Sequence, residues 1–550
     1  MSNQRNSKNP GFVMQGVVLA SASIIVRVIG LLYRIPLTNI LGDEGNGLYS
    51  YAFEIYNIAL LLSSYSLPLA VSKLVSARAN HGERNNAYRV FKLAMVLAVI
   101  IGAIVGITVY VGSDFIAGTV MKAPMSAYAV RVLAPCLFIV AILGVMRGYC
   151  QGLGTTIPTA TSQILEQIIN AIVSIVAASY FVKIGMEITE TTGEELMAAA
   201  LGAAGGTTGT VMGALTALIF MSFVLFTYRK VIRKQIARER NVVEEPYSDI
   251  LKILTLTAVP VILSTAIYNI NSILDQGLYN NIMSTQGFLE EEYYALWGMY
   301  SGKYKVLQNV PLSVSNSFAT SVIPSLTIAV VAKNRREAHE KIGLAIRLSM
   351  LIAIPSFVGF LIFAEPILNL LFSGDNTTAS YIMMIGSVAI IFYCLSTVTN
   401  GILQGLNKMT VPIKNAAISL VIHLVFLLLF LCVFKWHVYS VVLSSAIFAL
   451  SMCLLNARAI RKYSRYEQEI KKTFILPMLS AIVMGIVSYL AFIGCEMLVG
   501  EKVAIIIAIV IAGITYMIAL LKTGAMPEED IYNMPKGNKL VHLLKKVKLL

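Results

Sequence analysis

The sequence predicts an all-α, polytopic membrane protein with about fourteen transmembrane helices. Three observations support this fold class: the composition, the lengths of the apolar runs and the charges of the connections between them. Of the 550 residues, 57% are hydrophobic and 13% are charged, whereas soluble proteins carry about 25% charged residues. The apolar runs are about twenty residues long, which is the length a helix needs to cross a hydrocarbon core of about 30 Å. Helices are expected because an open sheet would leave backbone groups unpaired in lipid.

Fourteen segments fit this length. The first apolar run continues through Leu32, which is too long for the core of a cleaved signal peptide, so it is interpreted as an uncleaved span. In chain order, the predicted spans are residues 12–36, 47–77, 89–112, 126–147, 158–182, 197–228, 250–281, 296–331, 342–363, 379–402, 412–434, 439–457, 474–495 and 502–521.

The charges of the connections test this map independently. The second, sixth, eighth and twelfth connections are strongly basic, while the connections on the opposite side are acidic or nearly neutral. Lys and Arg collect on the cytosolic side of membrane proteins, so the alternation predicts a protein of the cytoplasmic membrane with both termini in the cytosol. The same rule explains the net charge of +14, and a nucleic-acid partner is not expected because no basic and aromatic platform is present.

The two halves of the chain repeat each other. The segment Gly148-Tyr149-Cys150-Gln151-Gly152-Leu153 returns as Gly401-Ile402-Leu403-Gln404-Gly405-Leu406, and Leu67-Pro68 returns as Ile323-Pro324 at a similar offset. An offset of six helices predicts parallel repeats, which in transporters enclose a site between two lobes. The predicted divisions are a six-helix lobe at 1–228, a basic cytosolic linker at 229–248, a second six-helix lobe at 249–460, two additional helices at 461–522 and a basic amphipathic cytosolic tail at 523–550.

Ionisable residues inside the apolar spans are the candidate functional residues. A central Arg, Lys or Asp costs about 2.5–3.5 kcal/mol on insertion scales, so such a residue is expected to face a cavity or a partner. Arg27 and Arg34 lie two turns apart on the first span, with Gly30 between them, and therefore share one face. We expect Arg27 to face a cavity, while Arg34 faces the cavity or extends to the interface. Glu54 on the second span lies at a level where Arg34 could reach it.

Further candidates lie on the fifth, seventh and eighth spans. Glu166 could pair with Arg27 or bind a coupling cation, and the sequence leaves both options open. Ser264, Tyr268, Asn271 and Asp275 fall on one face of the seventh span, which is typical of cavity lining or of hydrogen bonds between helices. Lys303 and Lys305 lie on the eighth span and point to different faces, so one of them at most is expected to line a given cavity.

These charges favour a transporter of an anionic substrate. Cationic groups predominate in the spans that open each half, and the bidentate fork of Arg suits phosphate. No catalytic constellation, phosphate-binding loop or metal-ligand pattern occurs in the sequence, and none of the six cysteines forms a C-x-x-C pair. The sequence therefore predicts a protein that is not an enzyme, without a cofactor or metal. Na⁺ or H⁺ could provide coupling through Glu54, Glu166 or Asp275.

Several segments resemble a known family. Arg27-Val28-Ile29-Gly30-Leu31-Leu32-Tyr33-Arg34-Ile35-Pro36-Leu37, Gly42-Asp43-Glu44-Gly45-Asn46-Gly47-Leu48-Tyr49, Leu67-Pro68-Leu69-Ala70-Val71-Ser72-Lys73 and Arg147-Gly148-Tyr149-Cys150-Gln151-Gly152-Leu153-Gly154 are similar to segments of polysaccharide flippases of the stage V sporulation protein B group. This group belongs to the multidrug/oligosaccharidyl-lipid/polysaccharide (MOP) superfamily, which includes the lipid II flippases.

The resemblance implies two six-helix lobes plus two extra helices, alternating access, and an undecaprenyl-diphosphate-linked sugar as substrate, with lipid II or a related envelope precursor favoured. It also implies that Arg27 and Arg34 correspond to the cavity-lining pair on the first helix of lipid II flippases, and that Lys303 or Lys305 takes the position on the eighth helix. The arginine of the second helix has no counterpart, because Leu60 to Ser64 occupy that region. A monomer is expected.

Three alternatives stay open at this point. A cation-coupled multidrug antiporter of the same superfamily would prefer acidic cavity groups. A membrane glycosyltransferase or polymer ligase would need catalytic groups and an external sugar site. A structural scaffold for sporulation would need neither.

Overall fold

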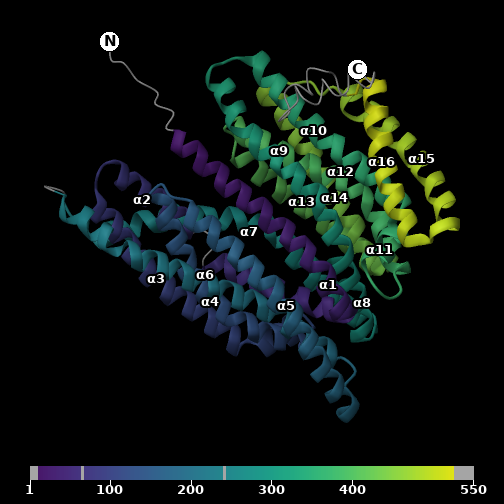
Figure 1. Ribbon diagram of the computed structural model, residues 1–550, viewed down its shortest axis with the longest axis horizontal. Helices are drawn as coiled ribbons and strands as arrows, with labels where there is room; N and C mark the ends of the chain where they lie inside the picture. Colours follow the sequence, from purple (N-terminus) through teal and green to yellow (C-terminus); the bar gives the residue numbers. More distant parts are fainter. Residues whose placement is uncertain (1–9, 64–66, 240–242, 526–550) are drawn as a thin grey trace. The chain divides into compact units, whose positions relative to one another are not determined.

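The computed structural model describes residues 10–63, 67–239 and 243–525, and the regular elements in these ranges are all helices (Figure 1). The predicted amphipathic tail lies outside the described residues from 526 onward. The chain divides into two compact units, Met1–Gly302 and Lys303–Leu550, which are described separately. This division does not coincide with the predicted lobe boundaries, which stay predictions.

The first unit holds eight α-helices and the short turns between them. In order they are α1 (Pro10–Ser63), α2 (Leu67–Asn80), α3 (Arg84–Val111), the π-helix η1 (Phe115–Val120), the 3₁₀-helix η2 (Pro124–Ser126), α4 (Ala127–Gly152), α5 (Ile157–Thr192), α6 (Met197–Ala237), α7 (Tyr247–Thr285) and α8 (Glu290–Gly298). A π-helical turn, η3 (Met299–Tyr304), carries the chain across the boundary into the second unit.

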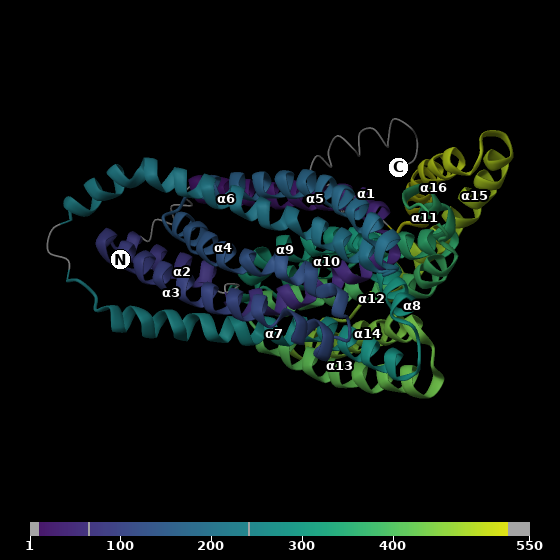
Figure 2. The same cartoon turned by 90° about the horizontal axis from the view of Figure 1, so that it is seen from below.

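The second unit holds the remaining eight α-helices. They are α9 (Lys305–Val331), α10 (Arg335–Ile362), α11 (Ala364–Leu371), α12 (Thr377–Gly405), α13 (Thr410–Leu428) with the π-helix η4 (Leu429–Phe434), α14 (His437–Ser464), the π-helix η5 (Lys471–Ile475), α15 (Leu476–Val499) and α16 (Glu501–Thr523). The last two helices lie side by side (Figure 2). Phe363 at the end of α10 and Phe492 of α15 bury their rings together with Ala504, Ile505 and Ala508 of α16.

Twelve segments of the described residues are long and apolar enough to cross a membrane. Eleven of them correspond to single predicted spans, and the twelfth, Ser21–Leu61, covers parts of the first two. The seventh predicted span has no counterpart among these segments of the described residues. The predicted all-α polytopic class is therefore confirmed, while the count of fourteen stays a prediction.

The first two predicted spans are joined through a break in α1 at Gly42. This residue has φ 69° and ψ −177°, a conformation that glycine adopts without steric cost. The buried side chain of Asn46 donates to the carbonyl oxygens of Thr38 at 3.0 Å and of Gly42 at 2.6 Å. It thereby provides hydrogen bonds for carbonyl groups at the break, where buried acceptors without a partner would be costly.

Close helix packing explains the repeated glycine motif. A Cβ added at Gly148 of α4 would lie 2.5 Å from the carbonyl oxygen of Pro68 in α2, so α2 and α4 touch through their backbones. In the second unit, a Cβ at Gly401 of α12 would lie 3.1 Å from the side chain of Ala319 in α9. The repeated glycine thus packs against an earlier helix of its own unit in both halves.

Helices α5 and α6 of the first unit lie side by side and contact each other closely. Glycines recur along α6 on the side that faces α5. A Cβ at Gly209 would lie 2.1 Å from Ser174 Oγ, and one at Gly205 would lie 2.6 Å from the carbonyl oxygen of Ala177. Small residues at three- and four-residue spacing permit this backbone approach between membrane helices.

Candidate functional site

The predicted α1 face lies beside α5. Gly30 is close to this helix, because a Cβ there would lie 3.3 Å from Gln167 Nε2. One turn earlier, the side chain of Arg27 is exposed. One turn later, the guanidinium of the half-buried Arg34 lies 4.2 Å from the centre of the Tyr49 ring, a cation–π contact. Arg34 is therefore held by an aromatic side chain, whereas Arg27 is open to its surroundings.

A polar stripe on α5 lies next to this face. It consists of Gln163, Glu166, Gln167, Asn170 and Ser174, which recur at three- and four-residue spacing and therefore lie along one side of the helix. Asn170 Nδ2 donates to Tyr33 Oη of α1 at 3.4 Å, and Ser174 Oγ donates to Asn170 Oδ1 at 3.0 Å. Gln163 Oε1 is buried and accepts no hydrogen bond from the described residues.

The two contacts between the helices also set their register. Gly30 meets Gln167, and three residues later Tyr33 meets Asn170, so α1 and α5 run in the same direction at this contact. Continuing one turn back places Arg27 level with residues 163–164. The backbone of Arg27 is thus level with that of Gln163, whose side-chain oxygen has no hydrogen-bond partner among the described residues.

Glu166 forms an ion pair with a residue that the sequence analysis did not consider as a partner. Arg147 Nη2 lies 2.7 Å from Glu166 Oε2, and Arg147 Nε donates to Ser162 Oγ at 2.9 Å. The Arg147 and Glu166 side chains are 14% and 28% exposed, so the pair is largely removed from solvent. Arg147 is the last residue of the fourth predicted span, and the structure places it within α4, five residues before the end of this helix.

The other acidic candidates lie close to α7. Glu54 Oε2 accepts a hydrogen bond from Ser272 Oγ at 3.3 Å, and Asp275 is 2% exposed. Asn271 is half-buried, and its Oδ1 has no hydrogen-bond partner among the described residues. The side chains of Ser264 and Tyr268, which completed the predicted stripe, lie outside the described residues.

The two lysines of the eighth predicted span have different environments in the second unit. Lys303, in the π-helical turn η3, is buried with 3% exposure. It lies near Asp375, since hydrogen bonds from Thr377 and, to a lesser extent, the Lys303 charge hold the pKa of Asp375 below its usual value. Lys305 begins α9 and is half-buried. The expectation that the two lysines point to different faces stays a prediction.

The site has the chemistry of a binding surface. In the parts of the chain that the structure describes, no group of three or more His, Cys, Asp or Glu side chains could hold a metal ion. What the structure brings together is a cation on α1, hydrogen-bonding groups on α5 and an internal ion pair on α4 and α5. Arg147, Gln163, Gln167 and Asn170 were missed in the sequence, although the three- and four-residue spacing of polar residues in 157–192 could have identified the last three.

Comparison with known proteins places the chain in a family. The family described as "Polysaccharide biosynthesis protein" matches residues 13–329, which is more than half of the chain. The chain belongs to the polysaccharide biosynthesis protein family. A second family profile, MatE, matches residues 307–429 of this family member.

Relatives of this polysaccharide biosynthesis protein match it over most of their length. Stage V sporulation protein B of Bacillus subtilis (strain 168) is 22% identical over 539 residues, which cover 96% of this chain and 99% of the relative. Lipid II flippase MurJ of the same organism is 24% identical over 489 residues, which cover 85% of this chain and 86% of the relative. The solved structure of lipid II flippase MurJ in an inward closed conformation has a TM-score of 0.63 at 15% identity, with 92% of this chain and 98% of that chain covered.

These findings confirm the predicted MOP-superfamily membership and the multi-pass helical fold. The matches to lipid II flippase MurJ and to the MatE profile show that this family member is a membrane transporter of the MOP superfamily and not an enzyme. A multi-pass protein of the cell membrane follows from the same comparisons together with the candidate spans.

Proposed function

We propose that the chain is a flippase that moves an undecaprenyl-diphosphate-linked sugar, such as lipid II or a related envelope precursor, across the cytoplasmic membrane by alternating access. The observation that carries the proposal is the exposed Arg27 beside the polar stripe of α5. An arginine at this depth is costly unless it meets water, a partner or a ligand, and its planar fork matches the oxygens of a diphosphate.

The other sites take supporting roles in this proposal. Arg34 stays close to Tyr49 and extends the cationic face of α1. Gln163 and Asn271 each have a buried amide oxygen without a hydrogen-bond partner among the described residues, and such oxygens can accept from the hydroxyl groups of a sugar. Of the two lysines in the second unit, Lys305 is the better candidate for a substrate contact, because it is half-buried whereas Lys303 is buried.

Coupling belongs to the proposal as well. Glu166 already has a cationic partner in Arg147, which favours a structural role for it. Glu54, which accepts from Ser272, and the buried Asp275 stay in the proposal as candidates for a site of Na⁺ or H⁺ coupling. Cytosolic termini, a monomeric state and the predicted lobe boundaries complete the proposal.

Complementation tests this function. A bacterial strain depleted of its own lipid II flippase should grow when it expresses the wild-type chain, because the lipid-linked precursor would again reach the outer face. Arg27→Ala should fail to rescue growth at equal protein level, whereas Lys92→Ala, which removes an exposed cation from α3, should rescue it. Rescue by Arg27→Ala would reject the role of this residue, and failure of the wild-type chain would argue against lipid II as the substrate.

A cation-coupled multidrug antiporter is the second candidate function, and the MatE match over residues 307–429 favours it. An antiporter would depend on acidic groups that bind organic cations. In that case Asp275→Asn would abolish drug resistance in a drug-sensitive strain, and Arg27→Ala would leave the resistance intact.

A further inference from the structure

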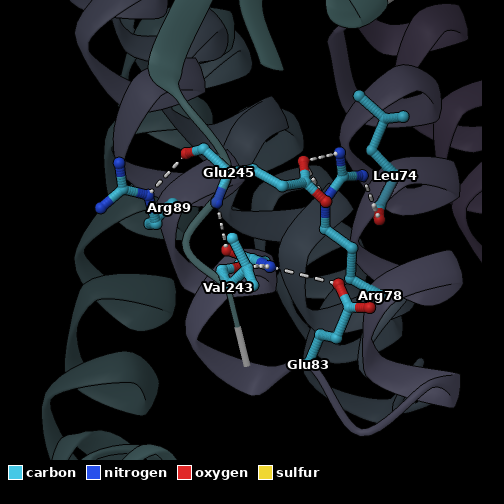
Figure 3. Close-up of polar contacts among 7 residues, drawn as sticks. Leu74, Arg78, Glu83, Arg89, Val243 and Glu245 are labelled. Carbon is cyan, nitrogen blue, oxygen red and sulfur yellow. Dashed lines mark hydrogen bonds and ion pairs between the residues drawn. The ribbon is translucent and has the colours of Figure 1, made fainter. Parts of the chain in front are cut away.

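The connection between α6 and α7 is fastened to the α2–α3 turn (Figure 3). Arg78, at the end of α2, donates from Nε to both carboxylate oxygens of Glu245 at 3.0 Å, and its Nη2 also contacts this carboxylate. Arg78 Nη1 donates to the carbonyl oxygen of Leu74 at 3.1 Å. The Arg78 side chain is 9% exposed, so all three of its nitrogens are engaged in a largely buried setting.

Backbone hydrogen bonds hold the same connection. The buried side chain of Asn86 donates to the carbonyl oxygen of Val243 at 3.1 Å and accepts from the Glu245 backbone N–H at 3.0 Å. Arg89 Nε donates to the Glu245 carbonyl oxygen at 3.1 Å. We call Arg78, Asn86, Arg89 and residues 243–245 the inner clasp.

The inner clasp continues into α7. The guanidinium of Arg89 lies 4.2 Å from the centre of the Tyr247 ring, at the first residue of this helix. Ile250 and Leu254 follow one and two turns later, and both are buried in one hydrophobic cluster with Leu67, Val71, Leu74 and Val75 of α2 and with residues of α3 and α4. The first part of α7 is therefore attached to the first unit by charges, backbone hydrogen bonds and apolar packing.

A similar arrangement occurs in the second unit. His339 Nε2 of α10 donates to the carbonyl oxygen of Ser464 at 2.7 Å, and Arg347 lies 3.9 Å from Glu469. Tyr466 packs against the His339 ring, and burial raises the pKa of its hydroxyl to about 12. Arg347 follows Arg89 at an offset of about 258 residues, close to the offset of the sequence repeat. In each half, the segment that follows a long basic helix is fastened back onto its own unit through an arginine.

We propose that the inner clasp stays closed through the whole transport cycle, so that the first part of α7 moves with the first unit. This inference rests on the proposed alternating access, because only a cycling transporter offers the alternative that α7 moves away. Opening the clasp would take the Glu245 carboxylate from the buried Arg78, which would keep only the Leu74 carbonyl. Asn86 would lose its two backbone partners and keep only the Glu83 carboxylate. A buried charge that loses its ion-pair partner and a buried amide that loses hydrogen bonds are strongly disfavoured. The exposed pair Arg336–Glu340, with side chains 91% and 63% exposed, shows the contrasting case of an ion pair that water can replace at little cost.

A distance measurement tests this proposal. Spin labels would be placed at Lys92→Cys of α3 and Lys252→Cys of α7, two exposed positions on either side of the clasp. The background would carry Cys432→Ser and Cys495→Ser, which remove the two cysteines that are not buried. In lipid vesicles we expect one narrow distance distribution between the labels, unchanged by lipid II or by Na⁺. Arg78→Ala should broaden it or add a longer distance, and the exchange Arg78→Glu/Glu245→Arg should restore the narrow distribution. Arg336→Ala is the matched control and should change nothing.

Two separate label-to-label distances in the wild-type background, or a shift of this distance when lipid II is added, would overturn the proposal. A distance distribution that Arg78→Ala leaves unchanged would overturn it as well. The distances do not depend on lipid movement. If the distance distribution is as expected but the wild-type protein moves no lipid II across the vesicle membrane, the proposed function is wrong and the proposal of a closed clasp is retained. If lipid II moves and the wild-type distance is split, the clasp proposal fails alone.

Discussion

At the residue scale, the membrane charges of the first unit fall into two classes. Arg34 and Glu166 have partners that account for their presence in an apolar span, namely the Tyr49 ring and the Arg147 guanidinium. Arg27 differs because its side chain is exposed next to a polar stripe. The sequence could identify all three as residues with a high free energy of membrane insertion, since this free energy depends on residue type and on depth in the bilayer. It could not identify the partners, because Arg147 and Tyr49 reach them only through the packing of α4 and of the second part of α1.

The ion pair on α4 and α5 supports a prediction at this scale. Arg147→Ala should lower the free energy of unfolding by about 1–3 kcal/mol, because it leaves the partly buried Glu166 carboxylate without its guanidinium partner. The loss should be smaller than for a fully buried ion pair, because the Glu166 side chain is 28% exposed. Arg147→Ala/Glu166→Ala should recover most of the loss. Thermal unfolding of the purified proteins in detergent would measure both. Glu166→Ala that stops transport without changing the melting temperature would instead assign this residue to coupling.

At the element scale, glycine positions decide how closely helices pack. Gly42 permits the break in α1, and Gly47 and Gly298 let α8 lie directly on the second part of α1, where added Cβ atoms would fall 2.3 Å from the Tyr294 carbonyl oxygen and 1.8 Å from the Asp43 carbonyl oxygen. Apolar run length predicted most of the spans, because it reflects bilayer thickness. It could not predict that α8 packs onto α1, because this contact depends on a close approach between backbones far apart in the sequence.

The close contact between α5 and α6 predicts that adding one methyl group at a glycine of α6 destabilises the protein. Gly209→Ala should destabilise the protein by about 1–3 kcal/mol, because the new Cβ would overlap Ser174 Oγ and the Asn170 carbonyl oxygen and force the helices apart. Gly494→Ala is the matched control, since a Cβ there meets nothing within 4 Å and alanine is the better helix former. Melting temperatures would show a decrease for the first variant alone. Equal melting temperatures for the two variants would argue against the tight packing of α5 on α6.

At the scale of the whole molecule, the chain consists of two units whose boundary lies within the π-helical turn η3. The sequence repeat places a lobe boundary earlier, in the basic connection after α6. The inner clasp explains why this connection is not free: Glu245 and Val243 are bound to α2 and α3. At its other end, α7 is held by Asn280, which accepts from Tyr51 Oη at 2.7 Å and donates to the Met121 carbonyl oxygen at 2.8 Å. Hydropathy and loop charge contain no signal for such contacts, so the predicted boundary followed the repeat alone.

The measurement that tests the central claim most directly is the movement of labelled lipid II by the purified protein in vesicles. The account predicts that the wild-type chain moves the label across the bilayer, that Arg27→Ala reduces the rate at least tenfold, which corresponds to a loss of about 1.4 kcal/mol or more, and that Lys92→Ala retains the wild-type rate. Undiminished movement by Arg27→Ala in vesicles that contain equal amounts of folded protein would contradict it.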